Sequence, residues 1–212
     1  MPGSAGARPA LAGDWLDPGI ACDLGFDGLA PDAAAAGVRQ ALADAPVDIV
    51  ALPTGGRRKK LLVADMDSTI ITVECIDELA DFAGLKAEIS EITERAMRGE
   101  IAFEGALRER VGKLKGLGLE ALQKAYDERV RLNPGAETLV KTMAAHGTRC
   151  VLVSGGFTFF TSRVADLAGF HANSANTLND DGAELTGLVG DQILGKEAKL
   201  AALQEEAAEL GL

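Results

Sequence analysis

The sequence predicts an α/β fold in which a parallel sheet carries an inserted helical cap. Two short apolar runs, Leu61–Ala64 and Cys150–Val153, each end in a polar turn, as buried parallel strands do. A long segment with helical spacing, about 75–131, separates the two runs. Because ligand chemistry in open α/β sheets lies at the carboxyl ends of strands, polar groups in the two turns are expected to face a crevice.

Length and charge narrow the classes of function. The 212 residues, 47% of them apolar, suit one modest α/β domain with an insert. A net charge of −11 argues against nucleic acid as a partner, because phosphate binding needs clustered cations. No apolar run approaches membrane-spanning length, so no membrane is expected either. The cysteines Cys22, Cys75 and Cys150 lack metal-like or redox-pair spacing and predict a reducing cytoplasm.

Residues 1–56 are expected to form a region distinct from residues 57–212. An alanine-rich run, Asp32–Ala45, predicts a helix, and Val47–Leu52 predicts a short strand. One helix and one strand are too little to fold alone, so this region is interpreted as a remnant of a larger unit.

The cap segment has the spacing of several helices. Ile76, Leu79, Ala80 and Ala83 lie on one helical face, and Gly84 suits the helix end. Three further helices are predicted at Lys86–Met97, Phe103–Leu114 and Leu119–Val130. An all-helical insert directly after the first turn is interpreted as a lid.

The second half of the chain continues the α/β pattern. Asn133-Pro134-Gly135 predicts a helix that has proline at its first position and runs to His146. Asp180-Asp181-Gly182 indicates a hairpin turn. The other predicted elements are a strand at Thr148–Val153, a helix at Thr158–Leu167, strands at His171–Ala175 and Glu184–Val189, and a helix at Glu197–Leu210.

The turn after the first strand reads D-M-D-S-T and carries two carboxylates, Asp65 and Asp67. A carboxylate placed there can attack phosphorus and form an acyl-phosphate. The second can give a proton to the leaving alcohol and later take one from water. Taken alone, such paired acids more often cap a helix or bind solvent.

The rest of the chain supplies groups that suit an anion. The second turn reads S-G-G-F from Ser154, where the hydroxyl and N–H groups can hold an oxyanion and Gly155 allows a close backbone approach. The run K-E-A-K places an ammonium, from Lys196 or Lys199, at the start of the last helix. Nucleophile, anion cradle and cation thus follow one another along the chain.

The order D-M-D-S-T, S-G-G-F, K-E-A-K resembles the haloacid dehalogenase-like phosphatases, which have a Rossmann-like sheet. The resemblance runs from about Arg57 to the last residue. Four segments between the motifs resemble the branch of the family that hydrolyses O-phospho-L-serine. They are E-C-I-D-E-L-A from Glu74, T-E-R-A-M-R-G from Thr93, F-E-G-A-L-R-E-R-V from Phe103 and A-N-T-L from Ala175.

The resemblance implies a role for each group in the two turns. Asp65 is the nucleophile, and Asp67 is the acid and base. Asp65 and the backbone carbonyl of Asp67 hold Mg²⁺. Ser154 and the N–H of Gly155 hold phosphate oxygens, and Lys199 neutralises the phosphoryl group together with Asp65.

The resemblance also carries substrate contacts onto the cap. Glu74 pairs with the amino group of the substrate, and Arg110 binds its carboxylate. Met97 and Phe103 close the apolar side and exclude water. Without the resemblance, Glu74 is an acid in a first helical turn, Arg110 is a surface charge, and Met97 and Phe103 belong to the core.

One departure from the family pattern leaves alternatives open. The family's fourth motif, G-D-G-x-N-D, completes the magnesium site, but no aspartate follows Asp191, and we expect the sequence to be cut short at Leu212. The implied activity is the hydrolysis of O-phospho-L-serine, the last step of serine synthesis. In the family a regulatory or dimerising region often precedes the catalytic part, so residues 1–56 are interpreted as a remnant of such a region, and a homodimer is allowed. The alternatives are phosphotransfer to another alcohol such as homoserine, and a non-catalytic remnant.

Overall fold

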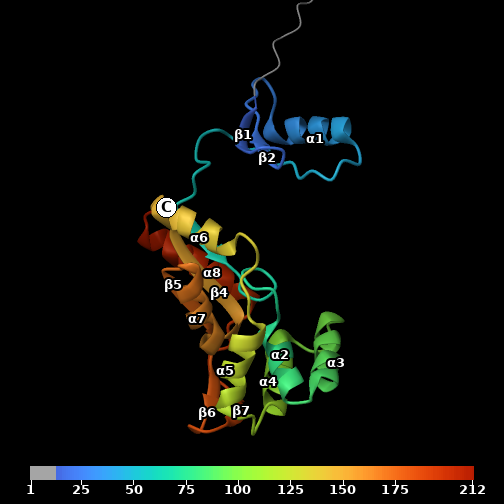
Figure 1. Ribbon diagram of the computed structural model, residues 1–212, viewed down its shortest axis with the longest axis vertical. Coiled ribbons are helices and arrows are strands. Elements are labelled where there is room, and N and C mark those ends of the chain that lie inside the picture. Colours follow the sequence, from blue (N-terminus) through green and yellow to red (C-terminus); the bar gives the residue numbers. More distant parts are fainter. Residues whose placement is uncertain (1–12) are drawn as a thin grey trace, which may run out of the picture. The chain divides into compact units, whose positions relative to one another are not determined.

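The computed structural model describes residues 13–212, and residues 1–12 of the predicted N-terminal region lie outside the described residues. The chain divides into two compact units between Arg58 and Lys59, which we call the N-terminal unit and the C-terminal unit (Figure 1). No helix within residues 13–212 is long and apolar enough to cross a membrane.

The N-terminal unit contains a hairpin and a helix. Strands β1 (Asp14–Asp17) and β2 (Ala21–Asp23) pair antiparallel, and helix α1 (Pro31–Leu42) begins at a proline whose missing N–H costs nothing there. The predicted strand at Val47–Leu52 is wrong, because the segment forms no ladder with the described strands. The carbonyl of Ile49 instead accepts a hydrogen bond from the side chain of Arg39 at 2.9 Å.

The C-terminal unit is built on a three-stranded parallel sheet, which confirms the predicted α/β class. Its strands are β3 (Leu61–Ala64), β4 (Arg149–Phe157) and β5 (Ala172–Asn176), in the order β3-β4-β5. Three helices pack against it: α6 (Ala136–Ala145), α7 (Thr158–Ala168) and α8 (Lys196–Glu209).

The register of the sheet determines where the polar turns lie. Strands β3 and β4 are paired from Leu61↔Arg149 to Ala64↔Leu152. Their carboxyl ends therefore lie side by side, and the residues that follow Ala64 face those that follow Leu152.

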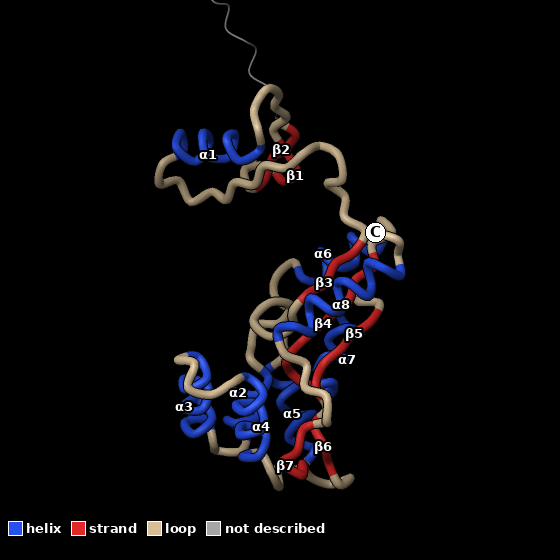
Figure 2. The backbone as a smooth tube through the Cα atoms, turned by 180° about the vertical axis from the view of Figure 1, so that it is seen from behind, coloured by secondary structure: helices blue, strands red, loops and turns tan. Residues whose placement is uncertain are grey.

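Four helices form the predicted cap, and a hairpin joins them. The helices are α2 (Cys75–Phe82), α3 (Lys86–Met97), α4 (Phe103–Lys113) and α5 (Leu119–Arg129). The hairpin β6 (Leu178–Asp180) and β7 (Leu185–Val189) packs beside α4 and α5 in both views (Figures 1 and 2). A bridge between Gly118 and Glu184 ties the hairpin to the start of α5.

The start of α6 differs from the prediction. The helix begins at Ala136, so Pro134 does not occupy its first position. Gly135 takes a positive φ of 86°, which favours glycine, and the amide of Asn133 donates to the carbonyls of Thr69 at 2.8 Å and Ile71 at 3.0 Å. These bonds keep Asn133 and Pro134 outside the helix.

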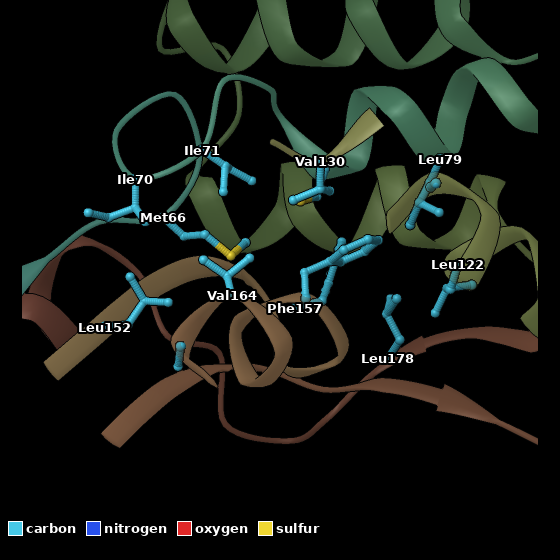
Figure 3. Close-up of a cluster of buried hydrophobic side chains, with 14 of the residues drawn as sticks. Met66, Ile70, Ile71, Leu79, Leu122, Val130, Leu152, Phe157, Val164 and Leu178 are labelled. Carbon is cyan, nitrogen blue, oxygen red and sulfur yellow. The ribbon is translucent and has the colours of Figure 1, made fainter. Parts of the chain in front are cut away.

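The cap and the sheet share one hydrophobic core. Its buried side chains come from the loop after β3, from β4, from helices α6 and α7, and from the cap helices and hairpin (Figure 3). Met66 and Phe157 are fully enclosed, at 0% and 1% exposure; Met66 lies just after β3, and Phe157 is the last residue of β4. Burial of these apolar side chains therefore anchors the loops that carry the polar groups.

Candidate active site

The loop after β3 directs alternate side chains to opposite sides. Met66 enters the core, whereas Asp65 and Asp67 on either side of it line a cavity. The Met66 carbonyl accepts the N–H groups of Thr69, Ile70 and Ile71 at 3.2, 2.9 and 3.1 Å, which closes the loop into a tight turn. The turn holds the two carboxylates at the edge of the sheet.

Asp65 is engaged at both carboxylate oxygens. Its Oδ1 accepts the N–H of Met66 at 2.9 Å, and its Oδ2 accepts Nζ of Lys199 at 2.5 Å. Lys199 lies in α8, far along the chain, so the fold brings the predicted cation to the predicted nucleophile. The side chain of Lys196, the rival cation, lies outside what the structure describes.

Asp67 sits in a more enclosed place. Its Oδ1 accepts the N–H of Cys75 at 3.2 Å, at the first residue of α2. Burial raises the pKa of Asp67 to about 6, and the nearby carboxylates of Glu74 and Asp65 add to the rise, while the Cys75 N–H opposes it. A carboxyl group with such a pKa carries a proton for part of the time near neutral pH, as an acid catalyst requires.

The raised pKa of Asp67 makes metal-free stability depend on pH. The pKa of Asp67 in the folded protein exceeds the usual 3.8. The stability that protonated Asp67 contributes is therefore fully present below pH 3.8 and is lost as pH rises through about 6. Asp67→Asn is therefore expected to raise the unfolding free energy in EDTA at pH 7 by up to about 3 kcal/mol, and by much less at pH 4.

Urea titrations at the two pH values measure this difference. Asp127→Asn, at an exposed carboxylate hydrogen-bonded to Gln123, is the control and should change neither value appreciably. An equal gain in unfolding free energy at both pH values would contradict the raised pKa of Asp67, because a pKa that differs between the folded and unfolded states makes the gain depend on pH.

The carboxyl end of β4 approaches the carboxylates closely. The strand extends through Ser154, Gly155 and Gly156 to Phe157, and Oγ of Ser154 accepts the N–H of Gly156 at 2.9 Å. A Cβ at Gly156 would lie 2.8 Å from Oδ2 of Asp67 and 3.1 Å from Oγ of Ser154, so a side chain there would displace these groups. Glycine lets the backbone approach the carboxylate closely.

The cap contributes the opposite wall. Glu74 at the start of α2 accepts the hydroxyl of Ser68 at 2.5 Å. Arg110 in α4 is partly buried, which lowers the pKa of its guanidinium, while the carboxylates of Asp77 and Glu74 act in the opposite sense. A Cβ added at Gly155 would lie 3.1 Å from the ring of Phe103, so the cap lies close to the carboxyl end of β4.

These groups line one cavity of about 280 Å³. It includes every predicted site residue except Met97, whose side chain is 85% exposed at the end of α3. Helix α3 buries Ile89 and Ile92, and Met97 does not lie on that face. The lining residues that sequence reasoning did not assign are Ile76, Leu107, Gly156, Phe157 and Gly195.

Of these unassigned residues, Gly156, Phe157 and Gly195 had a signal in the sequence. Gly156 and Phe157 lie in the S-G-G-F run, and Gly195 directly precedes the last helix. Ile76 and Leu107 are apolar residues at helical spacing, which is equally typical of a core.

Mg²⁺ fits the donors of this site in part. Mg²⁺ prefers carboxylate oxygens and keeps several waters, and Asp65 and Asp67 present such oxygens on one loop. Within residues 13–212, no group of three or more His, Cys, Asp or Glu side chains gathers around one point. The two aspartates could therefore hold the ion only together with water, substrate or backbone oxygens.

Comparison with known proteins gives consistent matches. The chain matches the haloacid dehalogenase-like hydrolase family over residues 62–212. A phosphoserine phosphatase from Polaromonas sp. (strain JS666 / ATCC BAA-500) is 46% identical over 158 residues, which cover 72% of this chain and 67% of that protein. One from Archaeoglobus fulgidus is 43% identical over 168 residues, which cover 78% of this chain and 48% of that protein.

The structural comparison agrees with the sequence comparison. A solved structure described as a phospho-aspartyl intermediate analogue of phosphoserine phosphatase is 37% identical and has a TM-score of 0.67. The match covers 73% of this chain and 73% of that chain. The chain thus spans about two thirds of the Polaromonas relative and about half of the Archaeoglobus relative.

Proposed function

The chain belongs to the haloacid dehalogenase-like hydrolases, and from this membership we propose that it hydrolyses O-phospho-L-serine to L-serine and phosphate. The relatives named phosphoserine phosphatase and the charges of the cavity support this proposal together. Each wall of the cavity suits a different part of that substrate.

The observation that carries the proposal is the ion pair of Asp65 and Lys199 beside the loop Ser154–Gly156, in one cavity with Glu74 and Arg110. A phosphoryl group fits the ammonium, the hydroxyl and the glycine backbone on the sheet side. An amino group and a carboxylate fit Glu74 and Arg110 on the cap side. O-Phospho-L-serine carries all three groups.

The chemistry follows from the two aspartates. A carboxylate oxygen of Asp65 attacks phosphorus, the bond between phosphorus and the serine oxygen breaks, and Asp67 gives its proton to that oxygen. Water then attacks phosphorus, Asp67 takes a proton from it, and the bond to Asp65 breaks. Inorganic phosphate leaves and both carboxylates return to their starting states.

Charge repulsion is the obstacle to the first step, because a carboxylate must approach an anionic phosphate. Lys199 contacts Asp65 and supplies one positive charge at this point. Mg²⁺, when bound, would be held by Asp65 and the backbone carbonyl of Asp67 and would supply further positive charge to offset this repulsion. Ser154 and the backbone of Gly155 orient the phosphate oxygens for in-line attack.

The cap wall explains substrate choice, and Arg110→Ala tests it. Loss of a charge-assisted, forked contact is expected to raise KM for O-phospho-L-serine about 10- to 100-fold. KM for p-nitrophenyl phosphate, which lacks the amino and carboxylate groups, should change by less than about threefold, because nothing in it reaches Arg110. Initial rates of phosphate release with both substrates, with and without Mg²⁺, provide the measurement.

The control is Arg108→Ala, at an exposed arginine of the same helix that does not line the cavity. It should leave both KM values unchanged. Equal losses on the two substrates in Arg110→Ala would remove this residue from substrate recognition. An intact chain that releases no phosphate from O-phospho-L-serine would contradict the proposed function itself.

Two finer expectations remain predictions. We propose a reducing, cytoplasmic location, supported by three unpaired cysteines, of which Cys75 and Cys150 are buried. The homodimer that the family resemblance allows is open to measurement by sedimentation.

A further inference from the structure

Asn176, the last residue of β5, has a buried amide between two segments of the cavity wall. The side chain is 1% exposed and is not part of the cavity lining. Its Nδ2 donates to the carbonyls of Gly155 at 2.8 Å and Leu194 at 3.3 Å, and its Oδ1 accepts the N–H of Leu194 at 2.7 Å. Both amide hydrogens are thus in use inside the protein.

One of these bonds controls a peptide plane. The carbonyl of Gly155 and the N–H of Gly156 belong to the same planar unit. Asn176 holds the carbonyl, and Oγ of Ser154 accepts the N–H at 2.9 Å. Between two glycines such a plane rotates easily unless both of its ends are held. The placement of the Ser154 hydroxyl therefore depends on the donor from Asn176.

The same plane leaves the serine hydroxyl ready to donate. Because Oγ of Ser154 accepts the Gly156 N–H, its own hydrogen remains available for a phosphate oxygen. If the plane turned over, the Gly155 carbonyl would take the place of the Gly156 N–H beside Oγ of Ser154. The hydroxyl would then donate its hydrogen to that carbonyl, and the hydrogen would no longer be available for a phosphate oxygen.

The other two bonds control the start of α8. Leu194 is bound to Asn176 through both its N–H and its carbonyl, and Gly195 directly after it is the N-cap of the helix. Lys199 lies one turn into that helix and contacts Asp65. One buried amide thus joins the segment that carries the hydroxyl to the segment that carries the ammonium.

We propose that Asn176 is a positioning residue for phosphoryl binding, acting through Ser154 and Lys199. The inference rests on the proposed function, because it assigns the phosphate group of the substrate to this half of the cavity. The amide of Asn176 does not contact the phosphoryl group. It sets the positions of the Ser154 hydroxyl and the Lys199 ammonium, which do contact that group.

Asn176→Ala is expected to lower kcat about 10- to 100-fold, the usual cost of removing a residue that orients a binding group. KM for O-phospho-L-serine should change by less than about threefold, because Glu74 and Arg110 still hold the amino and carboxylate groups. Affinity for inorganic phosphate, measured by calorimetry, should fall, because phosphate has only the affected half of the contacts.

The matched control is Asn173→Ala. Asn173 lies in the same strand and accepts the hydroxyl of Thr161 at 2.9 Å, away from the cavity. It should leave kcat and phosphate affinity unchanged. If Asn176→Ala does not fold, Asn176→Asp keeps the shape and the acceptor for Leu194 but loses both donors, and the same losses are expected from it.

A purely structural role of Asn176 makes different predictions, and coupling to Ser154 tells the two apart. If Asn176 acts through the hydroxyl, Asn176→Ala in a Ser154→Ala background should cost much less than it costs alone. A structural role would lower the Tm yet leave phosphate affinity unchanged and the two substitutions additive. Either of those results would overturn the inference.

Failure of the proposed function is separable from failure of this inference. A wild-type chain that binds phosphate but does not hydrolyse O-phospho-L-serine would contradict the proposed function, and the phosphate affinities of the variants would still decide the role of Asn176. A wild-type chain that neither binds phosphate nor hydrolyses the substrate would overturn both.

Discussion

Asp65→Asn is expected to abolish turnover of O-phospho-L-serine. The amide occupies the same space but is a very weak nucleophile, so the covalent route closes and kcat should fall by about four orders of magnitude or more. Stability should change little, because the pair with Lys199 is 37–40% exposed and contributes no more than about 1 kcal/mol. Single-turnover phosphate release and a thermal melt measure the two quantities.

A covalent readout makes this prediction sharper. Acid quenching of the wild-type chain during turnover should leave a phosphoryl group on the peptide that contains Asp65, detectable by mass, and the variant should show none. Asp166→Asn, at an exposed aspartate on α7, is the control and should keep both turnover and the label. A label that persists in Asp65→Asn would place the nucleophile elsewhere.

Local pattern was enough to predict most helices of the C-terminal unit. The helix at Lys86–Met97 has the predicted bounds, and those at Phe103–Lys113 and Leu119–Arg129 end one residue earlier than expected. Each has apolar residues at helical spacing and a glycine or polar break at its ends. In such segments the local preference and the packed structure agree.

Contacts between segments that are distant in the sequence were harder to predict. Val47–Leu52 has the composition of a strand but forms no ladder, whereas the hairpin turn predicted at Asp180-Asp181-Gly182 does join β6 to β7. The hairpin then packs on the cap, although it lies far from the cap helices in the chain. Which segments meet depends on tertiary contacts, and a local sequence pattern does not predict these.

The candidate site shows the same division. Asp65, Asp67 and Ser154 follow apolar strands directly, so the sequence alone places them at the edge of the sheet. Asn176 lies in the A-N-T-L segment that resembles the family, but the sequence assigned it no role, because an asparagine at the end of a short strand is also typical of a turn. Its importance comes from partners in two other segments.

The two walls of the cavity carry different groups, and in the proposed function they take different roles. The sheet side carries the groups that suit phosphate, whereas the cap side carries Glu74 and Arg110. Phe103 reaches from the cap to the glycine loop, where a Cβ at Gly155 would lie 3.1 Å from its ring. Closure of the cap over the substrate would exclude water from the attack on phosphorus.

Lys199→Met carries the second large effect. The substitution keeps much of the side-chain length but removes the only cation that the described residues place in contact with Asp65. Asp65 would then approach phosphate with its charge less compensated, and kcat should fall about 10²- to 10³-fold, as when one preorganised electrostatic contact is lost. KM should rise as well, since the ammonium faces the phosphoryl group before and during the reaction.

Two further lysine variants test whether the effect is specific to Lys199. Lys141→Met removes an exposed lysine paired with Glu137 on α6 and should leave kinetics unchanged. Lys196→Met tests the rival lysine of the same K-E-A-K run, and we expect less than about a tenfold loss because Lys199 already contacts Asp65. If Lys196→Met were the more damaging change, the ammonium at the nucleophile in the working enzyme would have to come from Lys196, and the pairing of Lys199 with Asp65 would not be the catalytic arrangement.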